Sequence, residues 1–180
     1  MTTDINIIIK AGTVKEVLLL QQVSIVTFID TYATYNTPEN MQLYIDTYFN
    51  YDRLWNELND TAIQYFLAFI NDEIVGYIKL RTVDEPVELE GKKHIEIERI
   101  YVLPEHKGRQ IGKKLISHAV GIATQQQYQV IWLGVWEENK NAITFYTKQG
   151  FAIFGEHSFV LGTEPQRDWL MKKELKAVGA

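Results

Sequence analysis

The sequence contains no cysteine among its 180 residues. This absence excludes a disulfide framework, a thiolate zinc site and a cysteine nucleophile. No apolar run approaches the roughly 18 residues of a membrane span, and the first residues have neither the basic region nor the apolar core of a signal peptide. A composition with 12% aromatic residues, 11 Gly and 4 Pro is not that of a disordered or collagen-like chain. We therefore expect a soluble cytoplasmic protein.

Basic residues are also outnumbered by acidic ones. The chain has 18 Lys and Arg against 23 Asp and Glu, a formal net charge of −5, which argues against a general nucleic-acid binder. Residues 1–100 carry 8 bases and 16 acids, whereas residues 101–180 carry 10 bases and 7 acids. This asymmetry is either ordinary surface variation or the mark of a cationic ligand on the first part and an anionic ligand on the second.

The hydrophobic pattern predicts strands and helices in one compact domain, with no internal repeat or linker. Strands are expected over residues 5–10, 63–70, 74–80, 94–102, 129–135, 151–161 and 167–175. Helices are expected over residues 13–34, 52–58, 109–127 and 141–149, with a further helix that Thr37 caps and Pro38 opens. This order predicts an α/β or α+β domain with a mixed sheet.

Apolar spacing and turn residues add detail to these elements. Asn71 to Glu73 is expected to form a hairpin turn, and Gly150 is expected to close the helix 141–149. The buried face of the helix 13–34 is expected to hold Val14, Val17, Leu18, Val23, Val26 and Ile29. The corresponding faces of the next helix and of the helix 109–127 are expected to hold Met41, Tyr44, Ile45, Tyr48, Ile111, Leu115, Ala119 and Ile122.

A glycine-bearing turn, residues 107–114, lies between a predicted strand and a predicted helix. Free backbone N–H groups and the helix dipole at such a turn suit a diphosphate. Four basic residues add positive charge there: Lys107, Arg109, Lys113 and Lys114. The spacing of Gly108 and Gly112 matches neither a Walker loop nor a dinucleotide-binding loop. The alternative is a basic helix N-terminus after an ordinary turn.

A second pattern, Asn-x-x-Ala-x-x-Phe-Tyr-x-x-x-Gly-Phe, covers residues 139–151. The predicted helix places Ala142 and Tyr146 on one face, four residues apart. Tyr146 is either a packing residue or a phenol that offers a proton to a leaving group.

These two stretches, residues 97–112 and 139–151, resemble the motifs of the GNAT N-acetyltransferase superfamily. The helix-rich N-terminal part and the tail from Gly155 to Gly162 resemble, more narrowly, bacterial polyamine acetyltransferases of the PaiA type. The resemblance implies a GNAT-like domain: a mixed, mostly antiparallel sheet of about seven strands, flanked by helices, with a splayed central strand pair.

The resemblance also implies a division of labour within one acetyltransferase domain, residues 1–180. The helix-rich residues 1–62 are expected on the acceptor side. Residues 63–135 are expected to supply the sheet and the CoA loop, and residues 136–176 the C-terminal helix and strand pair.

Acetyl-CoA is the co-substrate that the resemblance implies, held in a V-shaped opening between the strands that end at Val102 and Val135. A bulge near residues 99–101 would splay these strands. Backbone groups of Ile100, Tyr101 and Val102 would then pair with the pantetheine arm, and Asn139 would bind the same arm. Tyr146 would protonate the departing thiolate. The pyrophosphate would lie on the loop amides of Lys107, Gly108, Arg109, Gln110, Ile111, Gly112 and Lys113.

The loop departs from the family pattern at two positions. Lys107 stands where the family usually has Gln or Arg, and Gln110 replaces a glycine, whereas Gly112 fits. A glutamine at position 110 is tolerable if its backbone torsions stay ordinary, because its N–H then still reaches a phosphate.

An amine nucleophile with a pKa of roughly 10 must lose a proton before it attacks a thioester. Glu96 and Glu98 share one face of the predicted strand 94–102, beside the implied co-substrate. We expect Glu98 to be the general base, with Glu96 second; the alternative is that both are solvated acids. Direct attack needs no covalent enzyme intermediate.

The expected acceptor is a small cationic amine, a polyamine such as spermidine or spermine. Residues 39–60 carry five acids against Arg53, and residues 84–98 carry six acids against Lys92 and Lys93. The alternatives are a non-catalytic acyl-CoA sensor, or an acetyltransferase acting on protein amino termini, amino acids or aminoglycosides. We expect no metal, since the four histidines lack metal-ligand spacing, no nucleic-acid or membrane partner, and a monomer or homodimer.

Overall fold

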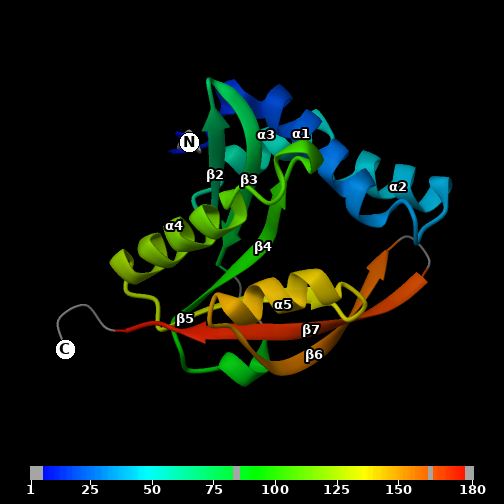
Figure 1. Cartoon of the computed structure of the whole chain (residues 1–180). Coiled ribbons are helices and arrows are strands. Elements are labelled where there is room, and N and C mark those ends of the chain that lie inside the picture. The colour runs from blue at the N-terminus through cyan, green and yellow to red at the C-terminus, as the bar shows by residue number, and fades with distance from the viewer. Residues whose placement is uncertain (1–5, 83–85, 162–163, 177–180) are drawn as a thin grey trace. The chain divides into compact units, whose positions relative to one another are not determined.

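The computed structural model describes residues 6–82, 86–161 and 164–176. Ile5 of the first predicted strand, residues 83–85 of the acidic stretch and Gly162 of the tail lie outside the described residues. Seven strands form one sheet in the order β1-β2-β3-β4-β5-β7-β6 (Figure 1). The strands are β1 (Ile8–Ala11), β2 (Ile63–Ile70), β3 (Glu73–Arg81), β4 (His94–Val102), β5 (Val130–Trp136), β6 (Ala152–Leu161) and β7 (Glu164–Glu174).

The α-helices are α1 (Val17–Tyr32), α2 (Pro38–Tyr48), α3 (Tyr51–Asn59), α4 (Ile111–Gln125) and α5 (Lys140–Lys148). β4 pairs parallel with β5, whereas β1–β2, β5–β7 and β6–β7 are antiparallel. The predicted α/β class and mixed, mostly antiparallel sheet are confirmed. The helix predicted over 109–127 is shorter at both ends, and the strand predicted over 5–10 is observed over Ile8–Ala11.

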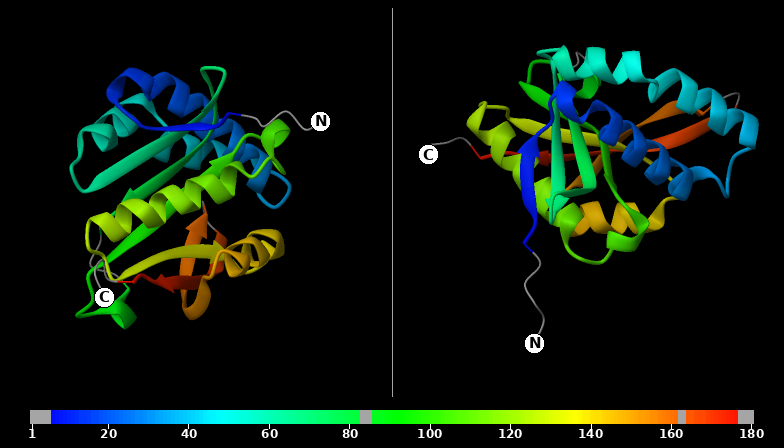
Figure 2. Two further views of the ribbon diagram at one scale, coloured as in Figure 1. Left: turned by 60° about the vertical axis from the view of Figure 1, so that its left-hand side comes forward. Right: turned by 90° about the horizontal axis from the view of Figure 1, so that it is seen from above.

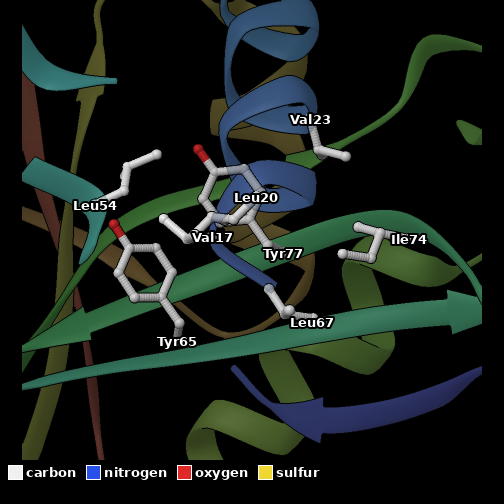
Figure 3. Packing of buried hydrophobic residues seen from close by; sticks show 8 residues of the cluster. All are labelled: Val17, Leu20, Val23, Leu54, Tyr65, Leu67, Ile74 and Tyr77. Atoms are coloured by element: carbon white, nitrogen blue, oxygen red, sulfur yellow. The ribbon is translucent and has the colours of Figure 1, made fainter. Parts of the chain in front are cut away.

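The chain divides into two compact units. The first comprises Met1–Lys79 and Arg99–Leu115, and the second comprises Leu80–Glu98 and Ile116–Ala180. The first has an apolar cluster of residues from α1, α3, β2 and β3 (Figure 3). Its members are Val17, Leu20, Val23, Leu54, Tyr65, Leu67, Ile74 and Tyr77. In the second unit, Leu89, Val130, Trp132 and Leu170 form a separate cluster.

Local signals in the sequence explain several element boundaries. Thr37 accepts a hydrogen bond from the Asn40 N–H at the start of α2, as an N-cap residue does. Asn71 and Asp72 have φ values of 47° and 66°, which the hairpin turn between β2 and β3 requires. Gly150, which follows the C-cap residue Gln149 of α5, has φ 88°, in the left-handed region that commonly ends a helix.

The predicted buried face of α1 is wrong in part. Leu18, Val26 and Ile29 are exposed, whereas Ser24 and Thr27 are buried. Thr27 Oγ1 donates a hydrogen bond to the Val23 carbonyl at 2.7 Å, so burial leaves this hydroxyl satisfied. α1 is apolar on nearly every side, so residue spacing alone does not identify the face that packs.

A buried charged cluster joins α3 to β2, β3 and β4 in the first unit. Glu57 Oε2 lies 2.9 Å from Lys79 Nζ, accepts a hydrogen bond from the Tyr65 hydroxyl at 2.5 Å, and lies 3.9 Å from Arg99 Nη1. Arg53 donates to Glu57 Oε1 from the surface at 2.9 Å. The Lys79 side chain is 1% exposed. Glu57 therefore compensates the positive charge of Lys79, which is buried away from water.

The long hairpin of β6 and β7 dominates the second unit (Figures 1 and 2). β7 pairs along all of β5, from Val130↔Glu174 to Trp136↔Asp168. The parallel ladder between β4 and β5 joins His94, Ile95 and Glu96 to the first three residues of β5, and both strands continue beyond it.

Candidate functional site

The loop before α4 presents backbone donors in the first unit. The first helical hydrogen bond runs from the Lys114 N–H to the Gln110 carbonyl at 3.0 Å. The N–H groups of residues 111–113 precede this bond, so they have no acceptor within the helix. Gly108 has φ 79°, and nothing lies within 4 Å of the position that a side chain there would occupy. These features suit an anion at the α4 N-terminus.

Two residues of this loop behave differently from expectation. Gln110 has φ 62°, so the condition of ordinary torsions, set above for a glutamine at this position, is not met. Its backbone adopts the left-handed conformation that the glycine of the family pattern takes without steric cost. The Lys107 ammonium forms an ion pair with Asp30 of α1. Lys107 therefore ties the loop to α1, which reduces the positive charge that it offers to a ligand.

Gln110→Gly is expected to raise the free energy of unfolding by about 0.5–1 kcal/mol. Glycine removes the steric cost of the left-handed conformation, although it also loses more backbone entropy on folding. Urea denaturation followed by tryptophan fluorescence measures the change. Arg109→Gly is the control. Arg109 has no positive φ, so glycine at this position should lower the free energy of unfolding. Equal changes in the two variants would contradict the argument.

The end of β4 is tightly packed in the first unit. A side chain at Gly76 of β3 would come within 2.6 Å of the Tyr101 carbonyl oxygen, so only glycine permits this approach. The Leu103 N–H donates to the Val75 carbonyl at 2.9 Å. Burial raises the pKa of Tyr101, and the neighbouring tyrosines Tyr32, Tyr44 and Tyr77 raise it further. The Tyr101 side chain is therefore a neutral packing group. The backbone groups of Ile100, Tyr101 and Val102 remain the candidates for binding the pantetheine arm.

The two candidate bases lie together on β4 in the second unit. Arg81 Nε is 2.5 Å from Glu96 Oε2 and 3.2 Å from Glu98 Oε2. One guanidinium thus bridges both carboxylates and offsets their mutual repulsion. The Glu98 side chain is 17% exposed and that of Glu96 9%. Glu98 is the more accessible of the two and lies at the longer distance from Arg81.

α5 holds the other two predicted residues of the second unit. Asn139 Oδ1 accepts a hydrogen bond from the Ala142 N–H at 3.1 Å and caps the helix, which the sequence analysis had not assigned to it. Its amide Nδ2 is the group left to bind a ligand. Tyr146 is buried, with its ring 5.3 Å from that of Phe145 and 6.1 Å from that of Phe151. Packing therefore fixes the position of the phenol.

The second unit contains Glu96, Glu98, Asn139 and Tyr146, of which Glu96 and Glu98 are brought together by their shared partner, Arg81; the first unit contains the loop and residues 100–102. Sequence reasoning missed Arg81, although an arginine on a strand preceding two alternating glutamates was a usable signal. Over residues 6–82, 86–161 and 164–176, no three His, Cys, Asp or Glu side chains are grouped so as to hold a metal. Helices in this part of the chain are too short or too polar to cross a membrane.

A model of the acetyltransferase (GNAT) family matches residues 27–151. The chain belongs to the GNAT acetyltransferase family. An N-acetyltransferase from Lactobacillus delbrueckii subsp. lactis is 38% identical over 149 residues, which make up 83% of this chain and 86% of that protein. The enzyme interpretation, an N-acetyltransferase of the GNAT fold, is thereby confirmed.

Two further matches to this GNAT enzyme, one in sequence and one in structure, come from Thermoplasma acidophilum. A spermidine N(1)-acetyltransferase is 27% identical over 127 residues, 68% of this chain and 74% of that protein. The crystal structure of the PaiA N-acetyltransferase in complex with coenzyme A has a TM-score of 0.78 and 23% sequence identity. That likeness covers 94% of this chain and 99% of the PaiA chain, and it shows the shared fold.

Proposed function

We propose that this GNAT enzyme transfers the acetyl group of acetyl-CoA to a primary amine of a polyamine such as spermidine or spermine. One observation carries the mechanism: Arg81 holds Glu96 and Glu98 side by side on β4, in the same unit as the buried phenol of Tyr146. A positioned carboxylate and a positioned phenol are the base and the acid that the reaction needs.

The residues of the loop before α4 fit the diphosphate of acetyl-CoA. The amides from Gly108 to Lys113 would bind its oxygens, because those of Ile111, Gly112 and Lys113 precede the first helical hydrogen bond. Arg109 and Lys113 are exposed and would add charge. Backbone groups of residues 100–102 and the Asn139 amide would hold the pantetheine arm.

Glu98 would accept the proton that the attacking amine loses, directly or through a water. Its greater exposure favours it over Glu96, which makes the shorter contact with Arg81 and so positions the guanidinium. Acetyl-CoA supplies the thioester carbonyl that the amine attacks directly. Tyr146 would give its phenolic proton to the departing sulfur, so that a neutral thiol leaves.

Charge and a relative's activity support a polyamine acceptor. The first 100 residues carry twice as many acids as bases, 16 against 8. Carboxylates attract a polycation over a long range and hold its distal ammonium while the reacting amine loses a proton. The spermidine N(1)-acetyltransferase from Thermoplasma acidophilum supports the same acceptor class.

The test is a thiol-release assay with acetyl-CoA and a panel of spermidine, spermine, a monoamine, a peptide, an amino acid and an aminoglycoside. Polyamines should have the highest kcat/KM at low salt. The KM for spermine should rise with added salt more than that for the monoamine, because the screening length falls to about 8 Å near 0.15 M salt. A peptide or aminoglycoside that outperforms both polyamines would overturn the acceptor assignment while leaving acetyl transfer intact.

A further inference from the structure

Gly134 of β5 is an exposed position with a carboxylate beside it. A side chain there would meet Asp168 Oδ2 of β7 at 3.4 Å and His157 Cε1 of β6 at 3.3 Å. Asp168 and His157 are directly paired residues of the β6–β7 hairpin. We call these three residues the Gly134 site. Because glycine has no side chain, the exposed Gly134 leaves the carboxylate and the imidazole close to the strand backbone with no Cβ between them.

Asp168 has a carboxylate oxygen for which the described residues supply no partner. Its Oδ1 is buried and makes no hydrogen bond within this part of the chain. Burial raises the pKa of Asp168 to about 6, and His157 acts in the opposite direction. The β5 residues beside it, Gly134 and Trp136, are not titratable. A carboxylate with one buried oxygen that makes no hydrogen bond is costly to the fold, which makes a cationic ligand a good partner for the group.

The strand register places the Gly134 site on the same face of the sheet as the two candidate bases. Paired residues on neighbouring strands share a face, and every second residue along a strand does so too. Glu96 pairs with Trp132, two residues before Gly134, and Asp168 pairs with Trp136, two residues after it. The Gly134 site, on β5 and the β6–β7 hairpin, thus lies on the face of the sheet that carries Glu96 and Glu98 on β4.

α5 lies on the opposite face of this sheet. Lys173, the neighbour of Lys172 on β7, donates a hydrogen bond from Nζ to the Gln149 carbonyl at the end of α5. Lys172 pairs with Trp132 and therefore shares its face, so Lys173 points the other way. Tyr146 of α5 and the Glu96, Glu98 and Asp168 carboxylates consequently belong to opposite faces, as expected for a leaving group and an entering amine.

We propose that Asp168, with His157 as its neighbour, is a specificity-determining residue that binds an ammonium group of the acceptor above Gly134. This inference rests on the proposed cationic amine acceptor. An ammonium has three donors, and it would form a charge-assisted hydrogen bond with Asp168 Oδ2, the carboxylate oxygen beside Gly134. The subsite binds the amine that does not react, and Glu98 remains the base.

Asp168→Asn tests this role in the whole enzyme, with spermidine and a monoamine as alternative acceptors. The KM for spermidine should rise by about 10-fold or more, because the charge of the hydrogen-bond acceptor is lost. The KM values for acetyl-CoA and for the monoamine should change less than about 2-fold. The wild-type KM for spermidine should fall as pH rises through about 6, where Asp168 ionises, and the Asn variant should lack this step.

Two further variants separate binding from folding. Gly134→Ala keeps the Asp168 charge but fills the space above the strand, and should also raise the KM for spermidine. Glu156→Gln is the matched control, since Glu156 pairs with Trp169, faces the other way and lies 3.5 Å from Arg167; it should leave the KM unchanged.

The outcomes distinguish this inference from the proposed function. Efficient acetylation of spermidine with an unchanged KM in Asp168→Asn would overturn the subsite and leave the polyamine acceptor standing. Failure of the wild-type enzyme to acetylate spermidine would overturn the acceptor instead. The subsite is then tested with the best cationic amine of the panel, and an unchanged KM for that amine in Asp168→Asn would overturn it too.

Discussion

Tyr146→Phe is expected to lower kcat by roughly 10- to 1000-fold, the range for loss of a general acid. The variant keeps the ring that packs against Phe145 and Phe151 and removes only the hydroxyl. Without its proton, the sulfur must leave as a thiolate. The drop should therefore appear in kcat and in the single-turnover rate, with little change in the KM for acetyl-CoA or in thermal stability.

Tyr128→Phe is the control for loss of a tyrosine hydroxyl in the same unit. The Tyr128 hydroxyl lies 3.0 Å from Thr82 Oγ1, and neither residue belongs to the proposed site. Its kcat should match that of the wild type. If Tyr146→Phe keeps full single-turnover activity, the phenol is a packing group and another donor protonates the sulfur.

Glu57→Gln is expected to lower the free energy of unfolding by about 3–5 kcal/mol at pH 7, the usual cost of removing one charge of a buried ion pair. The amide preserves the shape of the side chain and removes its charge. Lys79, 1% exposed, and Arg99, 5% exposed, would then lose the negative charge of Glu57. Guanidinium denaturation followed by circular dichroism measures the loss.

Glu57 should also make the stability of the fold depend on pH in the acidic range. Burial alone would raise the pKa of Glu57, but the Lys79 charge and the hydrogen bonds from Tyr65, Lys79 and Arg53 outweigh it and lower the pKa from 4.5 to about 2. A lowered folded-state pKa stabilises the fold above the unfolded value and loses that effect as pH falls. Wild-type stability should thus decline between about pH 4.5 and 2, and Glu57→Gln should show a smaller decline there.

Arg53→Gln provides the comparison with an exposed partner of the same carboxylate. Arg53 is 46% exposed and lies 2.9 Å from Glu57 Oε1. Its loss should cost less than about 1 kcal/mol, since solvent screens such a pair. Equal losses in Arg53→Gln and Glu57→Gln would show that the buried cluster contributes no more than a surface ion pair.

Local sequence chemistry was sufficient wherever the signal lies within a few consecutive residues. β2 and β4 begin and end at the predicted residues 63–70 and 94–102, because apolar and β-branched runs bounded by turn residues leave little choice. The N-cap at Thr37 and the left-handed Gly150 follow from the same kind of local preference. The candidate loop and Tyr146 stood out from the local pattern, and the motif resemblance led to the family and to the roles predicted for these residues and for the two carboxylates.

The sequence by itself therefore determined the element types, the fold class and the family. Tertiary structure alone decided which side of α1 is buried, because a helix with apolar residues on several sides packs on the face that its neighbours cover. It also decided the contacts of Arg81 with Glu96 and Glu98, of Lys79 with Glu57, and of Asp168 with the space above Gly134. Each of these contacts joins residues from different elements. The positions of these residues in the sequence do not reveal the strand register and packing that bring them together.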